Sequence, residues 1–122
     1  MSYDIRIGVK VDGMNGYIAV IDEPEYCSPT YNLRAMFVAC MDWDYEQSKW
    51  YNCQEVFPKI RHGQEELTLH PKKYEKYNDP SGWGTVKSAK ECLDSIVQKV
   101  VEIVSGDWSW NEIPIEHLWI CW

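Results

Sequence analysis

Apolar and polar side chains alternate at both ends of the chain, and period-two alternation is typical of a half-buried β-strand. In residues 3–11 every odd position is apolar or aromatic, and three of the four even positions are charged. A turn with two glycines at 12–16 and an apolar run at 17–21 complete a hairpin. Residues 115–122 alternate again after Pro114, so we expect this last strand to pair with a strand of the hairpin.

Three segments between these strands repeat apolar residues at helical spacing. Each segment is preceded by side chains that commonly cap a helix, and the longest is followed by a glycine that commonly ends one. The predicted helices are 31–41 after the start Ser28-Pro29-Thr30, about 53–67 after the capping pair Asn52 and Glu55, and 86–104 between a Thr85 cap and Ser105-Gly106.

The order β-β-α-α-α-β predicts an α+β fold, a small antiparallel sheet with helices packed on one face. A chain of 122 residues buries about two-thirds of its surface on folding, so we expect one domain over residues 1–122. Residues 42–51 break the helical pattern and are expected to form a loop. The charged connector 68–78 has room for a helical turn at 71–77, and Asp79–Gly84 is expected to turn.

The composition is ordinary except in its aromatic residues, which are seven Trp and eight Tyr against two Phe. Four of them lie on predicted strands, where they are expected to pack in the core or against another subunit. Five others lie in loops and at helix starts, where packing explains them less well. The strand group is Tyr3, Tyr17, Trp119 and Trp122, and the loop group is Tyr31, Trp43, Trp50, Tyr51 and Trp83.

The chain is acidic, with 19 acidic and 12 basic residues and a net charge of −7. Proteins that bind nucleic-acid backbones usually carry a basic stripe. The only basic cluster here is Lys72, Lys73 and Lys76, which argues against nonspecific nucleic-acid binding. An acidic surface suits a solvated protein or one that docks on a basic partner.

The five cysteines are odd in number and contain no CxxC pair, and the chain starts without a targeting pattern. We therefore expect reduced thiols, mostly buried as small apolar side chains, in a cytoplasmic protein. No apolar stretch reaches the roughly 18 residues of a membrane span, so no membrane contact is expected.

No motif identifies a reaction. The three histidines share no metal-binding spacing, so neither a metal nor a cofactor is expected. Cys53 follows a helix cap, and a helix N-terminus lowers a thiol pKa, but an inert buried cysteine is the favoured interpretation. Asp42 and Asp44 flank an aromatic residue, as paired acids do in glycosidases, but such pairs also occur in solvated loops. We expect no catalytic residues, and a small enzyme using Cys53 or the aspartates remains an alternative.

Helix starts and aromatic loops supply the parts of a ligand pocket. The turn before Thr85 contains glycines and opens a helix whose free N–H groups can cradle an anion. Aromatic walls would stack on a nucleobase, whereas the competing interpretation makes these aromatics anchors around a small core. The candidate ligand-binding residues are Ser28, Thr30, Tyr31, Asn32, Arg34, Trp43, Asp44, Trp50, Tyr51, Trp83, Gly84 and Thr85.

Four segments carry a resemblance to a group of small phage and prophage accessory proteins. They are Ser28–Leu33 (SPTYNL), Cys40–Asp44 (CMDWD), Lys49–Cys53 (KWYNC) and Gly82–Thr85 (GWGT). The resemblance implies a phage or mobile-element origin and a counter-defence role in the cytoplasm of a bacterial host. Proteins of this size with such roles include sponges that sequester a nucleotide signal and acidic inhibitors of a host nuclease or CRISPR effector.

The favoured hypothesis is a non-enzymatic protein that sequesters a small nucleotide-like ligand in an aromatic pocket. The first alternative is an acidic inhibitor that binds a host defence protein, and the second is a small enzyme of unknown reaction. The C-terminal strand also leaves room for pairing with another copy, so a homo-oligomer is an open outcome.

Overall fold

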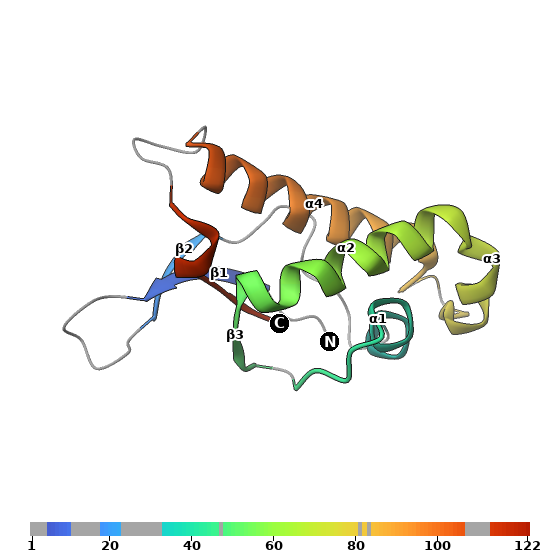
Figure 1. Cartoon of the computed structure of the whole chain (residues 1–122). Helices are drawn as coiled ribbons and strands as arrows, with labels where there is room; N and C mark the ends of the chain where they lie inside the picture. The colour runs from blue at the N-terminus through green and yellow to red at the C-terminus, as the bar shows by residue number, and fades with distance from the viewer. Residues whose placement is uncertain are drawn as a thin grey trace.

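The computed structural model describes residues 5–10, 18–22, 33–46, 48–80, 82, 84–106 and 113–122. It is an α+β fold in which helices pack on one face of a small antiparallel sheet, as predicted (Figure 1). In chain order the elements are β1 (Arg6–Lys10), β2 (Ile18–Asp22), α1 (Arg34–Met41), β3 (Trp50–Asn52), α2 (Cys53–Leu69), α3 (Pro71–Tyr74), η2 (Glu75–Tyr77), α4 (Val86–Ser105), η3 (Ile115–His117) and β4 (Leu118–Cys121).

The four strands form one sheet in the order β2-β1-β4-β3, and every neighbouring pair is antiparallel. The predicted pairing of the C-terminal strand with the N-terminal hairpin is confirmed, because β4 pairs with β1 from Arg6 opposite Cys121 to Val9 opposite Leu118. The sheet therefore joins the two ends of the described chain through its two central strands.

Strand alternation divides the sheet into two faces. Ile5, Ile7, Leu118 and Ile120 are fully buried on the inner face, where α2 contacts β3 and β4. In Figure 1, α2 and α4 run side by side over the sheet, and α3 lies at the end of the helical layer that is farthest from the strands. Arg6 and Lys10 are exposed on the outer face, as the sequence alternation predicted.

The helix boundaries follow local capping chemistry. Thr85 and Ser88 form a capping box at the start of α4, where the Thr85 hydroxyl accepts from the Ser88 amide and the Ser88 hydroxyl accepts from the Thr85 amide. Gly106 ends this helix at a φ of 85°, a left-handed conformation that glycine adopts without a steric cost. None of the described helices is long and apolar enough to cross a membrane.

The structure corrects three of the sequence-based boundaries. Residues 50 and 51, predicted as loop, form the edge strand β3 together with the predicted cap residue Asn52, because the partner β4 supplies the hydrogen bonds. The last apolar run opens with the 3₁₀ turn η3 after Pro114 and becomes a strand only at Leu118. Helix α1 begins at Arg34, with Leu33 as its N-cap residue and no side-chain hydrogen bond at the cap. The predicted turn at 12–16 and the start at Ser28-Pro29-Thr30 lie outside the described residues.

Gly63 lets three helices meet at one point. It is buried in the middle of α2, and a Cβ built on it would lie 2.6 Å from Met41 Cγ and 3.2 Å from both Cys40 Sγ and Leu93 Cδ1. These neighbours come from α1 and α4, so a residue without a side chain is required for the close approach of both helices to α2.

Replacing Gly63 is expected to destabilise the protein. In Gly63→Ala the overpacking cost of about 1–3 kcal/mol opposes a helix-propensity gain of about 1 kcal/mol, and in Gly63→Val the larger side chain makes the loss clear. Urea unfolding of the parent and both variants measures the change. A Gly63→Val protein as stable as the parent would contradict the packing described here.

Glu66 of α2 connects this helix to α3 through hydrogen bonds. Its carboxylate accepts hydrogen bonds from Tyr74 Oη at 2.7 Å and from Lys73 Nζ at 3.2 Å, and His70 Nε2 lies 3.8 Å away. The bond from Tyr74, with that from Lys73 next, holds the pKa of Glu66 below its usual range. Burial, reinforced by the Glu66 carboxylate, raises the pKa of Tyr74, which therefore stays a hydroxyl donor near neutral pH.

A carboxylate with a lowered folded-state pKa stabilises the fold above the pKa of the unfolded chain and loses that effect as the pH falls through the folded-state pKa. We therefore expect urea-unfolding stability to fall between about pH 5 and pH 3, and this part of the fall to be smaller in Glu66→Gln. Glu65→Gln, at an exposed neighbour on the same helix, is the matched control and should follow the parent curve. Identical slopes for parent and Glu66→Gln would contradict this role.

Candidate functional site

Five aromatic rings meet where α1, the segment 42–49 and the sheet come together. Trp122, Phe37 and Tyr45 are at most 1% exposed, whereas Trp43 and Tyr51 are half-buried at the edge. The closest ring centroids are 4.9 Å apart, between Trp43 and Tyr51 in a T-shaped arrangement, and edge-to-face pairs of this kind stabilise a fold by about 0.5–1.5 kcal/mol each. This aromatic cluster consists of Phe37, Trp43, Tyr45, Tyr51 and Trp122.

The sheet and two hydrogen bonds hold this cluster together. Tyr51 lies opposite Ile120 in the β3–β4 register, which places it on the inner face of the sheet. The Ser48 amide donates to the Trp122 carbonyl at 2.9 Å, and the Glu46 amide donates to Tyr51 Oη at 2.8 Å. Residues 46 and 48 are thereby tied to Tyr51 of β3 and to Trp122, the residue that follows β4.

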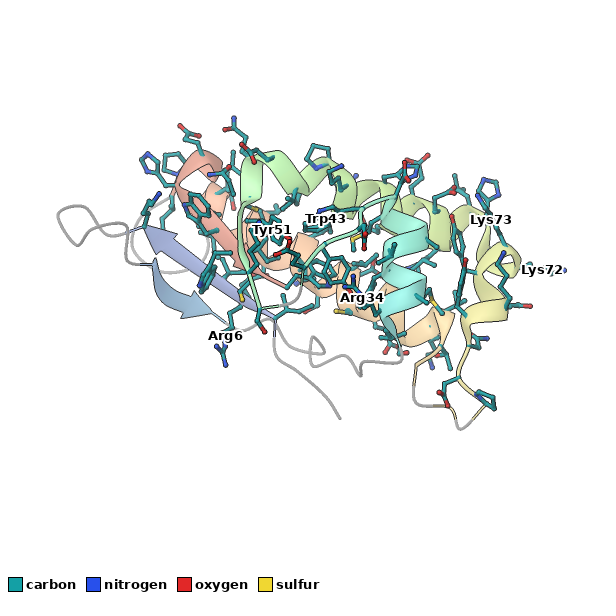
Figure 2. The ribbon with its side chains drawn as sticks, turned by 90° about the horizontal axis from the view of Figure 1, so that it is seen from below. Arg6, Arg34, Trp43, Tyr51, Lys72 and Lys73 are labelled. Atoms are coloured by element: carbon teal, nitrogen blue, oxygen red, sulfur yellow. The ribbon has the colours of Figure 1, made fainter. Side chains whose placement is uncertain are left out.

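Two cations lie over the rings that flank Trp43. The Arg34 guanidinium carbon is 4.7 Å from the Tyr45 ring centroid, and Lys49 Nζ is 5.4 Å from the Tyr51 ring centroid. Figure 2 shows Arg34, Trp43 and Tyr51 gathered in the middle of the molecule, well away from Lys72 and Lys73. We call this partly exposed surface the Trp43 rim; it consists of Arg34, Trp43, Asp44, Lys49 and Tyr51.

The ion pairs of the Trp43 rim are weak because water reaches them. Arg34 Nη2 lies 3.1 Å from Asp44 Oδ1, with the two side chains 38% and 87% exposed, and exposed pairs of this kind contribute about 0–1 kcal/mol. Lys49 Nζ lies 4.0 Å from Glu46 Oε2, also at the surface. Both cations can therefore exchange a protein carboxylate for an incoming anion at little cost.

The structure brings together four of the predicted ligand-binding residues and separates others from them. Arg34, Trp43, Asp44 and Tyr51 belong to the Trp43 rim. Trp50 lies opposite Cys121 in the register, so it belongs to the outer face of the sheet while its neighbour Tyr51 belongs to the inner face. The predicted residues outside the described part of the chain are Ser28, Thr30, Tyr31, Asn32 and Trp83.

Gly84 and Thr85 lie at the start of α4, as predicted, but protein atoms already bind much of this helix start. The Val86 amide donates to Asn78 Oδ1 at 2.9 Å, and the Thr85 and Ser88 amides donate within the capping box. The N–H groups proposed to cradle an anion are thus largely satisfied by the turn itself.

Three residues that shape this region were not among the predicted ligand-binding residues. Tyr45 and Lys49 lie in the segment predicted as a loop. No local pattern in this charged segment predicted that Arg34 would lie over the Tyr45 ring or Lys49 over the Tyr51 ring. Trp122 was predicted as a core or subunit-contact residue, and it is buried, but only the fold shows that it underlies Trp43. The density of aromatic residues in 42–51 is the one signal that pointed here.

Metal ligation and thiol chemistry are the two other possibilities that the described side chains raise. No three His, Cys, Asp or Glu side chains of the described ranges could hold a metal ion. Burial raises the pKa of both Cys40 and Cys53 to about 12, and for Cys53 this outweighs the expected lowering by the helix N-terminus. The predicted burial of Cys53 is confirmed, and its inertness stays a prediction.

An open groove of about 860 Å³ lies between α2 and α4, lined by both acidic and basic side chains. Asp94, on its wall, accepts hydrogen bonds from Gln64 Nε2 and Lys90 Nζ, both at 2.7 Å. The groove includes none of the predicted ligand-binding residues, and its mixed charge favours no particular ligand.

Alkylation checks this description of the thiols. At about pH 8 a thiol with a pKa of about 12 is roughly a thousandfold less ionised than an ordinary cysteine, so Cys40 and Cys53 should resist iodoacetamide in the folded protein and react in urea. Peptide mass spectrometry measures the modification at each position. Rapid labelling of Cys53 under native conditions would contradict its burial and would favour a reactive thiol.

Comparison with known proteins finds no matching family model and no significant similarity to a curated protein or a solved structure. The resemblance of four segments to phage accessory proteins therefore stays a prediction. Functional inference for this chain depends on the geometry of its own residues.

Proposed function

We propose that this protein binds a small anionic ligand with a planar ring, of the nucleotide class, at the Trp43 rim. The observation that carries the proposal is the position of Arg34: its guanidinium lies on the Tyr45 ring beside Trp43, yet the side chain remains 38% exposed. Sequestration of such a ligand without turnover, in a counter-defence role, is the function that the phage resemblance adds to this proposal.

The two parts of such a ligand would use different side chains. A phosphate suits the planar guanidinium of Arg34, which can donate two parallel hydrogen bonds, with Lys49 as a second point charge. A nucleobase suits the half-buried rings of Trp43 and Tyr51, because bases stack on aromatic faces. The floor of the rim, formed by Tyr45 and Trp122, is already packed and would need no rearrangement.

Asp44 would act as an internal competitor of the ligand. Its carboxylate already accepts a hydrogen bond from the Arg34 guanidinium at 3.1 Å, and an arriving phosphate has to displace this carboxylate. Because this exposed ion pair is weak, a phosphate dianion can replace the Asp44 carboxylate at Arg34. An uncharged nucleoside has no charge to pair with the guanidinium. The rim should therefore prefer phosphorylated ligands.

Thermal unfolding against a panel of mononucleotides, dinucleotides and cyclic nucleotides tests the proposal. A ligand at 100 times its Kd should add about 2.7 kcal/mol of stability, and the matching nucleoside should add little. Mass spectrometry of the recovered ligand should show it unchanged. A panel in which no nucleotide raises the melting temperature would contradict the proposal.

Three variants locate the binding site. Arg34→Gln should weaken binding about 10- to 150-fold, the equivalent of losing a charged hydrogen bond worth about 1.5–3 kcal/mol. Asp44→Asn should strengthen binding, because it removes the competing carboxylate. Lys72→Gln removes an exposed charge on α3, far from the rim in Figure 2, and should bind like the parent. Equal affinity in Arg34→Gln and Lys72→Gln would place the ligand elsewhere.

A further inference from the structure

The outer face of the sheet combines two indoles with basic side chains. The registers place Arg6, Gly8 and Lys10 of β1 on this face, together with alternate residues of β4 and β3. Those residues are Trp119 and Cys121 on β4, and Trp50 and Asn52 on β3.

Trp119 occupies the centre of this face. It lies opposite Gly8 on the neighbouring central strand, and Gly8 is buried although it has no side chain, as expected where an aromatic neighbour leans over a strand glycine. Lys10 Nζ lies 4.7 Å from the centroid of the Trp119 ring. Trp50 is a diagonal neighbour of Trp119, because it pairs with Cys121 two residues farther along β4.

Two basic side chains lie on this face, in a chain whose net charge is −7. Its register positions on β1, β3 and β4 include Arg6 and Lys10, both exposed, and no aspartate or glutamate. Burial raises the pKa of Cys121, so that this thiol adds no negative charge. Trp50 and Trp119 are half-buried, so neither residue is fully covered.

We propose that this outer face binds a short single-stranded nucleic acid. One unpaired base would stack on Trp119 and a second on Trp50, while Lys10 would contact a phosphate and Arg6 a second one in exchange for the interaction that it already makes. Aromatic side chains on the central strands of an open sheet are a recurring means of stacking unpaired bases. An acidic peptide would use the two cations but not the flat indoles, which favours a nucleic acid as the ligand.

This binding would depend on stacking more than on charge. With at most two phosphates neutralised by Lys10 and Arg6, the logarithm of the affinity should fall with the logarithm of the salt concentration with a slope of about −1.4 or shallower. Long duplexes would be repelled by the acidic remainder of the protein and would hide their base faces. The proposal departs from the sequence-based expectation of no nonspecific nucleic-acid binding, because that expectation considered only a basic stripe for the backbone and not stacking on the sheet.

Fluorescence anisotropy of a labelled octathymidylate tests this inference on the full chain. We expect the full chain to bind it. Trp119→Leu should weaken this binding about 5- to 150-fold, as expected for the loss of one stacked base, and Trp119→Phe should largely retain it. Lys10→Gln should make the salt slope shallower by about 0.7. Circular dichroism and urea unfolding check that each variant is folded, and Trp50→Leu, on the edge strand, gives a second test with less effect on folding.

The controls separate this site from the Trp43 rim. Arg34→Gln should bind octathymidylate like the parent, and Trp119→Leu should keep any thermal shift produced by a mononucleotide. The inference is overturned if octathymidylate does not bind, if folded Trp119→Leu and Trp50→Leu bind it as well as the parent, or if a labelled polyglutamate binds this face in its place. The Trp43 rim can fail its own test without affecting this result.

Discussion

The position of β4 between β1 and β3 is the constraint on which the rest of the structure depends. Its inward residues Leu118 and Ile120 are fully buried under the helices. Its register with β1 and β3 decides which residues of those strands face the core. Because side chains alternate along a strand, a shift of one residue would exchange the two faces of the sheet. It would turn Trp119 inward and expose the apolar residues that hold α2.

This constraint divides the aromatic residues of the chain. Tyr51 and Trp122 join Trp43 on the helical side, where edge-to-face contacts make them part of the core or its edge. Trp50 and Trp119 stay on the opposite side, where no described helix covers them. The excess of Trp and Tyr therefore serves two purposes: part of it builds the core of a small domain, and part of it stays accessible beside cations.

The cations near these rings are placed by aromatic faces as well as by carboxylates. Arg34, Lys49 and Lys10 each lie within 5.4 Å of a ring centroid, a contact that orients a charge while leaving it accessible to water. In a protein of net charge −7, such local positive sites are where an anionic ligand would be attracted. By contrast, Glu66 of α2 accepts hydrogen bonds from two side chains of α3 and acts within the fold.

The sequence by itself determined the elements whose causes are local. Alternation identified β1, a Thr85 cap and a terminal glycine bounded α4, and the Asn52 cap marked the start of α2, because period and capping act within a few residues. The α+β class followed from the order of these elements.

Only the tertiary structure decided β3 and the positions of the loop aromatics. A three-residue strand has no periodicity of its own and exists because β4 supplies its partners. The sequence grouped Trp43, Trp50 and Tyr51 as one set, whereas pairing with β4 sends Trp50 to one face and Tyr51 to the other. Which side of a sheet a residue occupies depends on a partner about seventy residues away, and no local pattern contains that information.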